Sequence, residues 1–183
     1  MTKEEPLEVT YAFIDAQNLY KAIREQGWEL DYGRFRRWLT EKFNVSKAFL
    51  FIGYIAENES LYTYLQKQGF IIVFKPIMKL SDGRVKGNVD AELVLHTMIE
   101  SSSYAKAVIV AGDGDYHCLV EHLAKSGKLR SLLVPNKNSY SALLRKFAND
   151  MTFLTGMDRR LGKKEGGSAT GRTPGVPPHP DIT

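Results

Sequence analysis

Blocks of apolar residues alternate with blocks of mixed polarity along the chain, and this alternation predicts strands and helices in turn. Short, continuous apolar runs, typical of strands buried on both faces of a sheet, lie at residues 11–14, 48–55, 70–74, 107–111, 129–134 and 151–154. Apolar residues recur at helical spacing at residues 19–26, 32–42, 59–68, 89–100, 117–126 and 139–147. Strands alternating with amphipathic helices favour an α/β class fold of three layers, α/β/α, with a mainly parallel sheet.

The helical spacing also predicts which side chains face the core. In residues 139–147, Leu143, Leu144 and Phe147 share one helical face, and we expect all three to point inward. Cys118 lies in the preceding predicted helix, and no neighbour in the sequence marks it as an activated nucleophile. We therefore expect Cys118 to be a buried structural thiol.

The two ends of the chain differ in composition from its middle, and this difference sets the expected domain boundaries. Residues 1–9 form a loose, acidic lead-in, and residues 10–157 hold all the predicted strands and helices in one domain. Residues 158–183 are basic, rich in glycine and proline, and poor in large apolar side chains. Such a segment cannot bury enough surface to fold, so it is predicted to be a disordered tail.

Composition narrows the expected location and partners. Hydrophobic residues make up 43% of the 183 residues, as in a globular protein, and no apolar run reaches the ~18 residues of a membrane span. The single cysteine rules out an internal disulfide bond, which fits a reducing cytoplasm, the location we expect. The net charge of +4 permits a nucleic-acid partner without requiring one.

The most informative stretch is KAVIVAGDGDY, residues 106–116, in which a buried strand opens into an acidic turn. Ligands of open α/β sheets collect outside the carboxyl ends of the strands, where Asp113 and Asp115 are expected. Asp115 is also a good N-cap for the helix that follows, and this role needs no ligand. It leaves Asp113 unexplained, because two neighbouring carboxylates repel each other unless a cation lies between them.

Two further acids are expected at the same edge of the sheet. Asp15 ends the first predicted strand, and Asp90 lies in the first turn of the helix that precedes the acidic turn's strand. A right-handed crossover brings the start of that helix to the edge where the strands end. Carboxylate oxygens that converge in this way suit Mg²⁺ or Mn²⁺. Each acid also has a structural alternative, since Asp90 favours a helix N-terminus, Asp15 can bond its own turn, and Asn18 is a fair N-cap.

Three segments, FIDAQNLY, KGNVDAEL and VIVAGDGDY, resemble the NYN domain, a PIN-like ribonuclease fold, and are closest to its bacterial LabA-like branch. The resemblance covers about residues 11–154 in order and spacing. It implies a parallel α/β sandwich that cleaves RNA phosphodiester bonds with a divalent metal. The family's functional positions fall on Asp15, Asn18, Lys86, Gly87, Asp90, Asp113 and Asp115. Of these, Asn18 and Lys86 are expected to bind the substrate.

The acidic turn departs from the family's usual Ser-Gly-Asp-Ser-Asp-Phe at three positions. Ala111 and Gly114 replace the two serines, and Tyr116 replaces the phenylalanine. Because both aspartates are retained, we expect metal binding to be retained as well. The loss of two hydroxyl groups leaves open how well substrate or metal-bound water is positioned, and with it whether the turnover rate is lower.

The sequence therefore predicts a metal-dependent ribonuclease, most simply an endoribonuclease, with Mg²⁺ or Mn²⁺ at Asp15, Asp90, Asp113 and Asp115. Asp115 is either the fourth ligand or the group that orients the attacking water. Lys86 and Arg84 belong to a basic loop, residues 75–87, that either offsets phosphate charge or is simply solvated. Tyr54, at the end of the second strand, either stacks on a base or packs as a rim tyrosine. The expected partner is single-stranded or structured RNA, and the sequence leaves homo-oligomerisation open.

Three other functions compete with this hypothesis. A non-catalytic RNA-binding or regulatory module with a retained metal site is supported only by the missing hydroxyls. A phosphatase with an aspartyl nucleophile needs a second acid two residues after Asp15, where the chain has Gln17. A PIN toxin would be accompanied by an antitoxin in a neighbouring reading frame. His96, His117 and His122 lack metal-ligand spacing and are expected to be structural.

Overall fold

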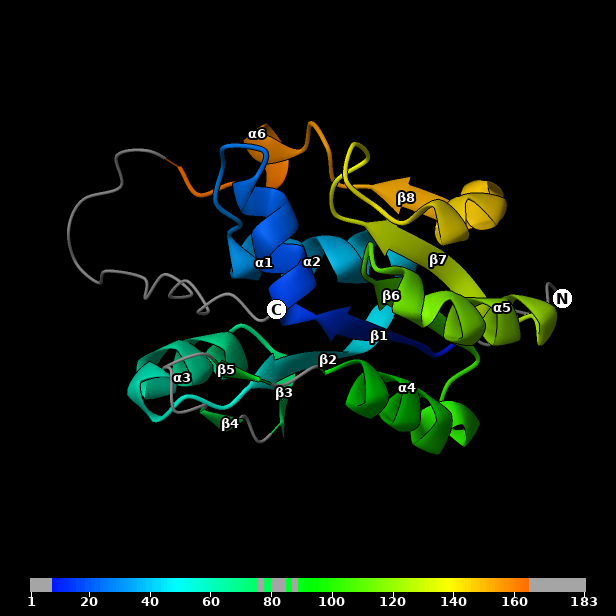
Figure 1. Cartoon of the computed structure of the whole chain (residues 1–183), viewed down its shortest axis with the longest axis horizontal. Coiled ribbons are helices and arrows are strands. Elements are labelled where there is room, and N and C mark those ends of the chain that lie inside the picture. Colours follow the sequence, from blue (N-terminus) through cyan, green and yellow to red (C-terminus); the bar gives the residue numbers. More distant parts are fainter. Residues whose placement is uncertain (1–7, 76–77, 80–84, 87–88, 165–183) are drawn as a thin grey trace, which may run out of the picture.

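A computed structural model of the chain describes residues 8–75, 78–79, 85–86 and 89–164, with backbone alone for 78–79 and 85–86. Six parallel strands form one sheet in the order β3-β2-β1-β6-β7-β8 (Figure 1). Their bounds are β1 Thr10–Asp15, β2 Val45–Gly53, β3 Phe70–Lys75, β6 Lys106–Val110, β7 Leu129–Val134 and β8 Met151–Phe153. Two further strands, β4 Met78–Lys79 and β5 Val85–Lys86, form a separate antiparallel pair. The predicted mainly parallel sheet is confirmed.

Helices connect successive strands of the sheet. The α-helices are α1 Ala16–Arg24, α2 Tyr32–Phe43, α3 Glu59–Lys67, α4 Asp90–Ile99, α5 His117–Lys125 and α6 Asp158–Leu161. Four 3₁₀ helices accompany them: η1 Ala56–Asn58, η2 Glu100–Ser102, η3 Gly114–Tyr116 and η4 Ala142–Asp150. Capping explains where α2 begins and ends, since the Asp31 carboxylate accepts from the Arg34 N–H and Asn44 adopts a left-handed φ of 56°.

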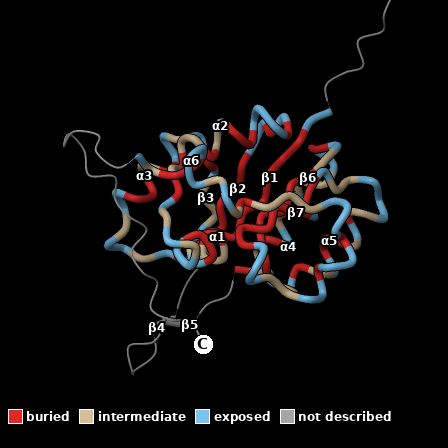
Figure 2. Tube along the Cα trace, turned by 90° about the horizontal axis from the view of Figure 1, so that it is seen from above, coloured by how far each residue is buried: buried red, intermediate tan, exposed pale blue. Residues whose placement is uncertain are grey.

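The alternation of side chains along the central strand builds two cores, one on each face of the sheet. Ala12 and Ile14 of β1 pack with residues of α1, α2, α3 and α6. Tyr11 and Phe13 point to the other face, among residues of α4, α5 and η4. The Phe13 ring stacks on Phe49 with centroids 5.3 Å apart. Figure 2 shows the central strands buried between the two helical layers, so the predicted three-layer α/β/α fold is confirmed.

The predicted start of the disordered tail at residue 158 is wrong. Asp158–Leu161 form helix α6, and Leu161 is almost fully buried against the core that contains α2. The backbone then pairs with the segment before α2, where Leu30 bridges Gly162 and the Lys163 N–H donates to the Glu29 carbonyl over 2.9 Å. The buried Leu161 side chain and these backbone contacts dock residues 158–164 on the domain. The rest of the predicted tail lies outside the described residues.

Two side-chain predictions are also wrong. Leu143 is 61% exposed, whereas Leu144 and Phe147 are buried as predicted. Residues 142–150 form two 3₁₀ turns that meet at a kink at Phe147, instead of one α-helix, so Leu144 and Phe147 face inward and Leu143 does not. Cys118 is exposed, because α5 turns its neighbours Leu119 and Val120 to the core instead.

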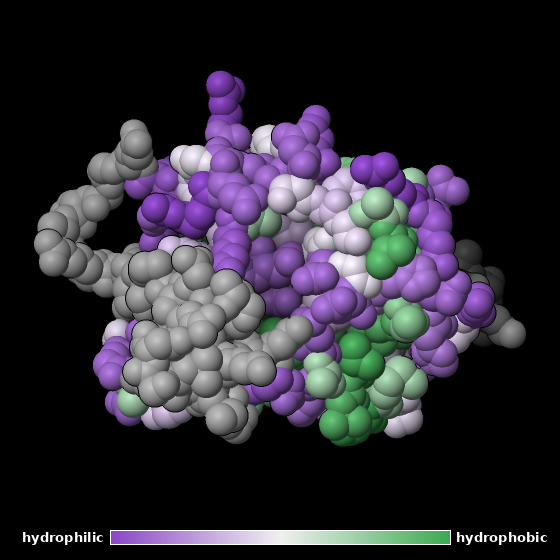
Figure 3. Space-filling model, viewed as in Figure 1, coloured by the Kyte–Doolittle hydropathy of each residue, from purple (hydrophilic) through white to green (hydrophobic). Residues whose placement is uncertain are grey.

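The surface carries an apolar patch away from the carboxyl ends of the strands. Leu95, Met98 and Ile99 of α4 are all exposed, and Figure 3 shows apolar side chains gathered over this helix. No helix in the described part of the chain is long and apolar enough to cross a membrane.

Candidate metal centre

The pairing of β1 with β6 brings two acidic segments to one edge of the sheet. Ile14 lies opposite Val110 in parallel register, so β1 and β6 reach the edge side by side. Asp15 ends β1, and the turn that carries Asp113 and Asp115 follows β6. Helix α4 begins at Asp90 beside them, since the Tyr116 hydroxyl of η3 contacts the Asp90 carboxylate. The structure therefore brings all four acids to this edge of the sheet.

Three of the four acids form a compact group. One carboxylate oxygen each from Asp90, Asp113 and Asp115 lies within 4.8 Å of the other two. This spacing is little more than the ~4 Å between opposite ligands of a Mg²⁺ ion. Asp113 and Asp115 are exposed and Asp90 is half-buried, so the group opens to solvent. Hard oxygen donors in this arrangement fit a divalent cation such as Mg²⁺ or Mn²⁺.

The electrostatics of this group favour a cation. The negative charge of Asp113, followed by a hydrogen bond and charge from Asp90, raises the pKa of Asp115 above its usual range. The three carboxylates therefore repel one another when all are ionised, and a bound divalent ion would relieve that repulsion.

Asp15 stands apart from this group because both of its oxygens are engaged by the protein. Its side chain is only 6% exposed. Oδ1 accepts from the Asn18 N–H over 2.9 Å, which caps the start of α1, and Oδ2 lies 2.8 Å from the Tyr116 hydroxyl. Burial raises the pKa of Asp15 to about 6, against the lowering effect of these two hydrogen bonds. The structural alternative for Asp15, a bond to its own turn, is thus present.

The Tyr116 hydroxyl lies between two carboxyl groups. It is 2.8 Å from Asp15 Oδ2 and 2.6 Å from Asp90 Oδ1. Burial, followed by the nearby carboxylates, raises the pKa of Tyr116 far above its usual range, so the hydroxyl keeps its hydrogen. The hydroxyl can donate its one hydrogen to only one of the two carboxyl groups. The contact with the other is a hydrogen bond only if that carboxyl group is protonated and donates to the hydroxyl oxygen. The raised pKa of Asp15 favours Asp15 for that role.

The acidic turn is held by residues from distant parts of the chain. The Asn18 side-chain oxygen accepts from the Gly112 N–H over 2.7 Å, and the Ser141 N–H donates to the Gly112 carbonyl over 2.9 Å. A Cβ atom at Gly114 would lie 2.5 Å from the Ser141 Oγ. Glycine at this position therefore lets the Ser141 hydroxyl approach the turn, where the family usually has a serine of its own.

The capping roles differ from the alternatives that the sequence left open. Asp15, rather than Asn18, caps α1. Asp113, rather than Asp115, caps the helical turn that follows, because its Oδ1 accepts from the Asp115 N–H over 3.1 Å. Asn18 instead fixes the acidic turn to α1. The side chains of Asp15, Asp113 and Asn18 thus fix the backbone turns around the acid group.

The predicted substrate-binding residues are only partly placed. Tyr54 is 43% exposed just after β2; its ring lies parallel to Tyr62, centroids 6.0 Å apart, and edge-on to Phe74 at 5.4 Å. Phe74 is 40% exposed, so the pair presents an open aromatic surface. Lys86 lies in β5, where the structure describes the backbone alone, and Arg84 lies outside the described residues.

Sequence reasoning missed two features of the centre. The role of the Tyr116 hydroxyl had no signal beyond the departure from phenylalanine, because both residues fit an apolar position. Glu92, in the first turn of α4, pairs with Lys75 at the end of β3 over 3.2 Å. The available signal for this link was an acidic residue two positions after Asp90. The link ties the start of α4 to the sheet.

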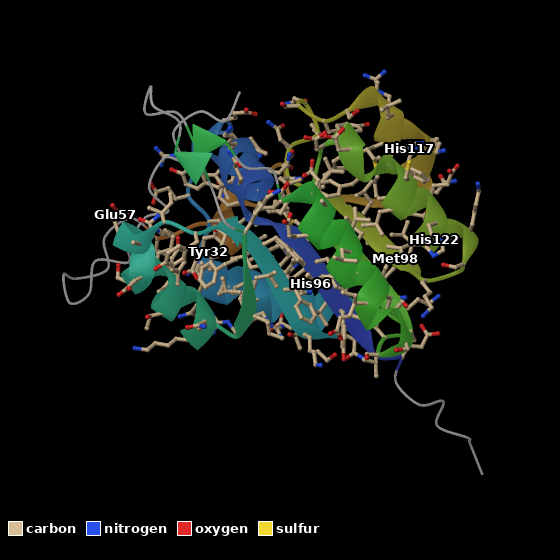
Figure 4. All side chains as sticks on the ribbon, turned by 60° about the horizontal axis from the view of Figure 1, so that its bottom comes forward. Tyr32, Glu57, His96, Met98, His117 and His122 are labelled. Atoms are coloured by element: carbon tan, nitrogen blue, oxygen red, sulfur yellow. The ribbon has the colours of Figure 1, made fainter. Side chains whose placement is uncertain are left out.

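The three histidines that are expected to be structural lie on α4 and α5. Figure 4 shows His96 on α4, and His117 and His122 on α5. The His96 ring packs against Phe51 with centroids 5.6 Å apart, and His117 packs against Phe147 at 5.7 Å. Within the described ranges, the group of acids with metal-ligand spacing contains no histidine.

Comparison with known proteins gives one family and one solved structure. The NYN domain matches residues 10–155. The fold is similar to the crystal structure of a protein of unknown function from Vibrio parahaemolyticus, with a TM-score of 0.68 and 23% sequence identity. The similarity covers 85% of this chain and 98% of that one. No curated protein matches.

Proposed function

The chain belongs to the NYN domain family, a family of PIN-like nucleases, and from this premise we propose that it is a metal-dependent ribonuclease of the LabA-like branch. In this proposal it hydrolyses RNA phosphodiester bonds as an endonuclease in the cytoplasm. The observation that carries the proposal is the open group of Asp90, Asp113 and Asp115 at the carboxyl edge of the sheet.

The acid group would hold Mg²⁺ or Mn²⁺, and such an ion supplies an activated water and stabilises charge on the phosphate oxygens. The protein's own part is to fix the donors. The bonds from Asn18 and Ser141 to Gly112 hold the turn that presents Asp113 and Asp115. Asp115, exposed on the open side of the acid group, is suited to orient the attacking water.

The substrate would be held beside the acid group. The exposed rings of Tyr54 and Phe74, at the carboxyl ends of β2 and β3, support stacking on an unpaired base. Stacking of this kind tolerates any base, so it favours single-stranded RNA without strong sequence preference. Lys86 and Arg84 would offset the phosphate charge from the basic loop.

The test is cleavage of a labelled single-stranded RNA, and of the same RNA folded into a hairpin, by the purified protein. We expect cleavage with Mn²⁺ or with Mg²⁺, and none with a chelator. The products should result from cuts inside the RNA with either metal. Asp113→Asn should lower the rate by at least about 100-fold, since a direct metal contact supplies several kcal/mol of transition-state stabilisation.

Glu41→Gln is the matched control, because it removes one acidic charge from an exposed position near the end of α2. Helix α2 ends where β2 begins, so Glu41 lies toward the opposite edge of the sheet. RNA binding without metal-dependent cleavage would favour the non-catalytic module, and cleavage by Asp113→Asn at the wild-type rate would contradict the assigned centre.

A further inference from the structure

The buried hydroxyl of Tyr116 is a feature of the centre that the family resemblance does not account for. The Tyr116 ring is fully buried, and its packing among apolar residues needs no hydroxyl group. Phenylalanine would fill the same volume. The hydroxyl nevertheless lies within hydrogen-bond distance of two carboxyl groups that come from different elements, Asp15 of β1 and Asp90 of α4.

We propose that Tyr116 is a positioning residue of the metal centre, which links Asp15 to Asp90 and leaves Asp90, Asp113 and Asp115 as the residues that contact the metal. This inference rests on the proposed function, since it concerns the same centre. It assigns Asp15 an indirect role, through the Tyr116 hydroxyl, instead of a direct metal contact.

The surroundings of Asp15 support an indirect role. The side chain is 6% exposed, and each of its oxygens has a protein partner, the Asn18 N–H at 2.9 Å and the Tyr116 hydroxyl at 2.8 Å. Asp15 is also outside the group of oxygens that lie within 4.8 Å of one another. A metal ion bound directly to Asp15 would have to share a buried side chain whose two oxygens already have protein partners, one of which caps α1.

The surroundings of Asp90 explain what the hydroxyl contributes. Asp90 is the first residue of α4, and its Oδ1 lies 2.6 Å from the Tyr116 hydroxyl. Hydrogen-bond partners of this kind fix the orientation of a metal-binding carboxylate. Their loss typically costs about 10- to 100-fold in metal affinity. Tyr116→Phe should therefore weaken metal binding while keeping the packing.

The test measures Mn²⁺ affinity by calorimetry for the full chain and four variants, with the melting temperature of each as a check on folding. Tyr116→Phe should bind Mn²⁺ about 10-fold more weakly than the wild type. Asp15→Asn should stay within about 3-fold of the wild type, because its amide can donate to Tyr116 while the hydroxyl donates to Asp90. Asp113→Asn should lose at least about 100-fold, as a direct ligand.

Tyr104→Phe is the matched control. Tyr104 is also a buried tyrosine, and its hydroxyl donates to the Thr97 carbonyl of α4 over 3.0 Å, away from the acids. We expect this variant to bind Mn²⁺ as the wild type does, which separates the loss of a buried hydroxyl from the loss of this particular link.

Each remaining outcome contradicts a stated part of the account. Wild-type affinity in Tyr116→Phe would overturn the positioning role of the hydroxyl. A loss in Asp15→Asn as large as in Asp113→Asn would overturn the indirect role of Asp15 and make it a direct ligand. If Tyr116→Phe does not fold, Asp15→Asn alone decides between these two roles. A wild-type protein that does not bind Mn²⁺ would instead remove the proposed metal centre, and the positioning role with it.

Discussion

The ends of β1 and β6 lie side by side at one edge of the sheet, and both carry aspartates, yet the two ends use them differently. Asp15, at the end of β1, is buried, and the protein itself occupies both of its oxygens. Asp113 and Asp115, after β6, are exposed and lie close to each other and to Asp90. Acid residues at adjacent strand ends can thus differ in role: Asp15 is enclosed by protein contacts, whereas Asp113 and Asp115 are open to solvent and to a ligand.

The physical cause of the difference is where each chain segment goes after its strand. Helix α1 starts directly at β1, so Asp15 becomes its N-cap and is drawn under the turn. After β6 the chain makes a turn around Gly112 and Gly114 before α5 starts, and this turn holds its acids out in solvent. Burial determines the role, because a buried carboxylate needs protein partners and an exposed pair needs only water or a cation.

The largest expected effect is on stability. Asp15→Ala removes an N-cap, worth about 1 kcal/mol, and leaves the Tyr116 hydroxyl without one buried partner, which costs roughly 1–3 kcal/mol more. Asp113→Ala should change the free energy of unfolding by less than about 1 kcal/mol, because the loss of its cap is offset by reduced repulsion with Asp115. Urea denaturation at about pH 5, where the buried Asp15 still holds its proton, measures both in the presence of a chelator. Equal losses in the two variants would break the distinction between the two strand ends.

The second expected effect is on the pH dependence of stability. The pKa of Asp15 is about 6 in the folded protein and 3.8 when unperturbed, so the folded state binds more protons between these values. The contribution of Asp15 to stability is therefore fully present below about pH 4 and is lost as pH rises through about 6, by roughly 3 kcal/mol in total.

Asp15→Asn has no such proton to lose, so it serves as the reference. In a chelator, the free energy of unfolding of the wild type relative to Asp15→Asn should fall from pH 4 to pH 7. Asp115→Asn, from the exposed end, should show a much smaller change because solvent screens its charge. A wild type that follows Asp15→Asn at every pH would contradict the burial assigned to Asp15.

The third and smallest expected effect is stabilisation by metal. At about 100 times its dissociation constant, Mn²⁺ should stabilise the wild type by about 2.7 kcal/mol, by mass action on the folded state. Asp15→Asn should keep most of this gain, and Asp113→Asn should lose it. Thermal unfolding at increasing Mn²⁺ measures the effect, with Ca²⁺ as a second ion. An unchanged melting temperature in the wild type would argue against a metal centre at the β6 end.

Much of this picture could be predicted from the sequence, because local patterns determine it. The apolar runs and helical spacing predict the parallel sheet, and the positions of Asp15, Asp90 and Asp113 at element ends predict their convergence. The roles within the centre could not be predicted, since they depend on contacts between distant residues. Asn18 and Gly112 are 94 positions apart, and Tyr116 and Asp15 are 101 apart.

The same reason explains the errors elsewhere in the chain. The segment from Asp158 is polar enough to suggest disorder. The contacts of Gly162 with Leu30 and of Lys163 with Glu29, far away in the sequence, explain why it folds. Leu143 was misplaced because the spacing of apolar residues does not separate an α-helix from a 3₁₀ helix over nine positions.

The most direct test of the difference between the two strand ends is a crystal structure with Mn²⁺, located by its anomalous scattering. We expect Mn²⁺ within about 2.0–2.4 Å of carboxylate oxygens of Asp90 and of at least one of Asp113 and Asp115. The Tyr116 hydroxyl should remain between Asp15 and Asp90, with Asp15 outside direct coordination. Manganese bound directly to Asp15, or no manganese at the acid group, would contradict the account.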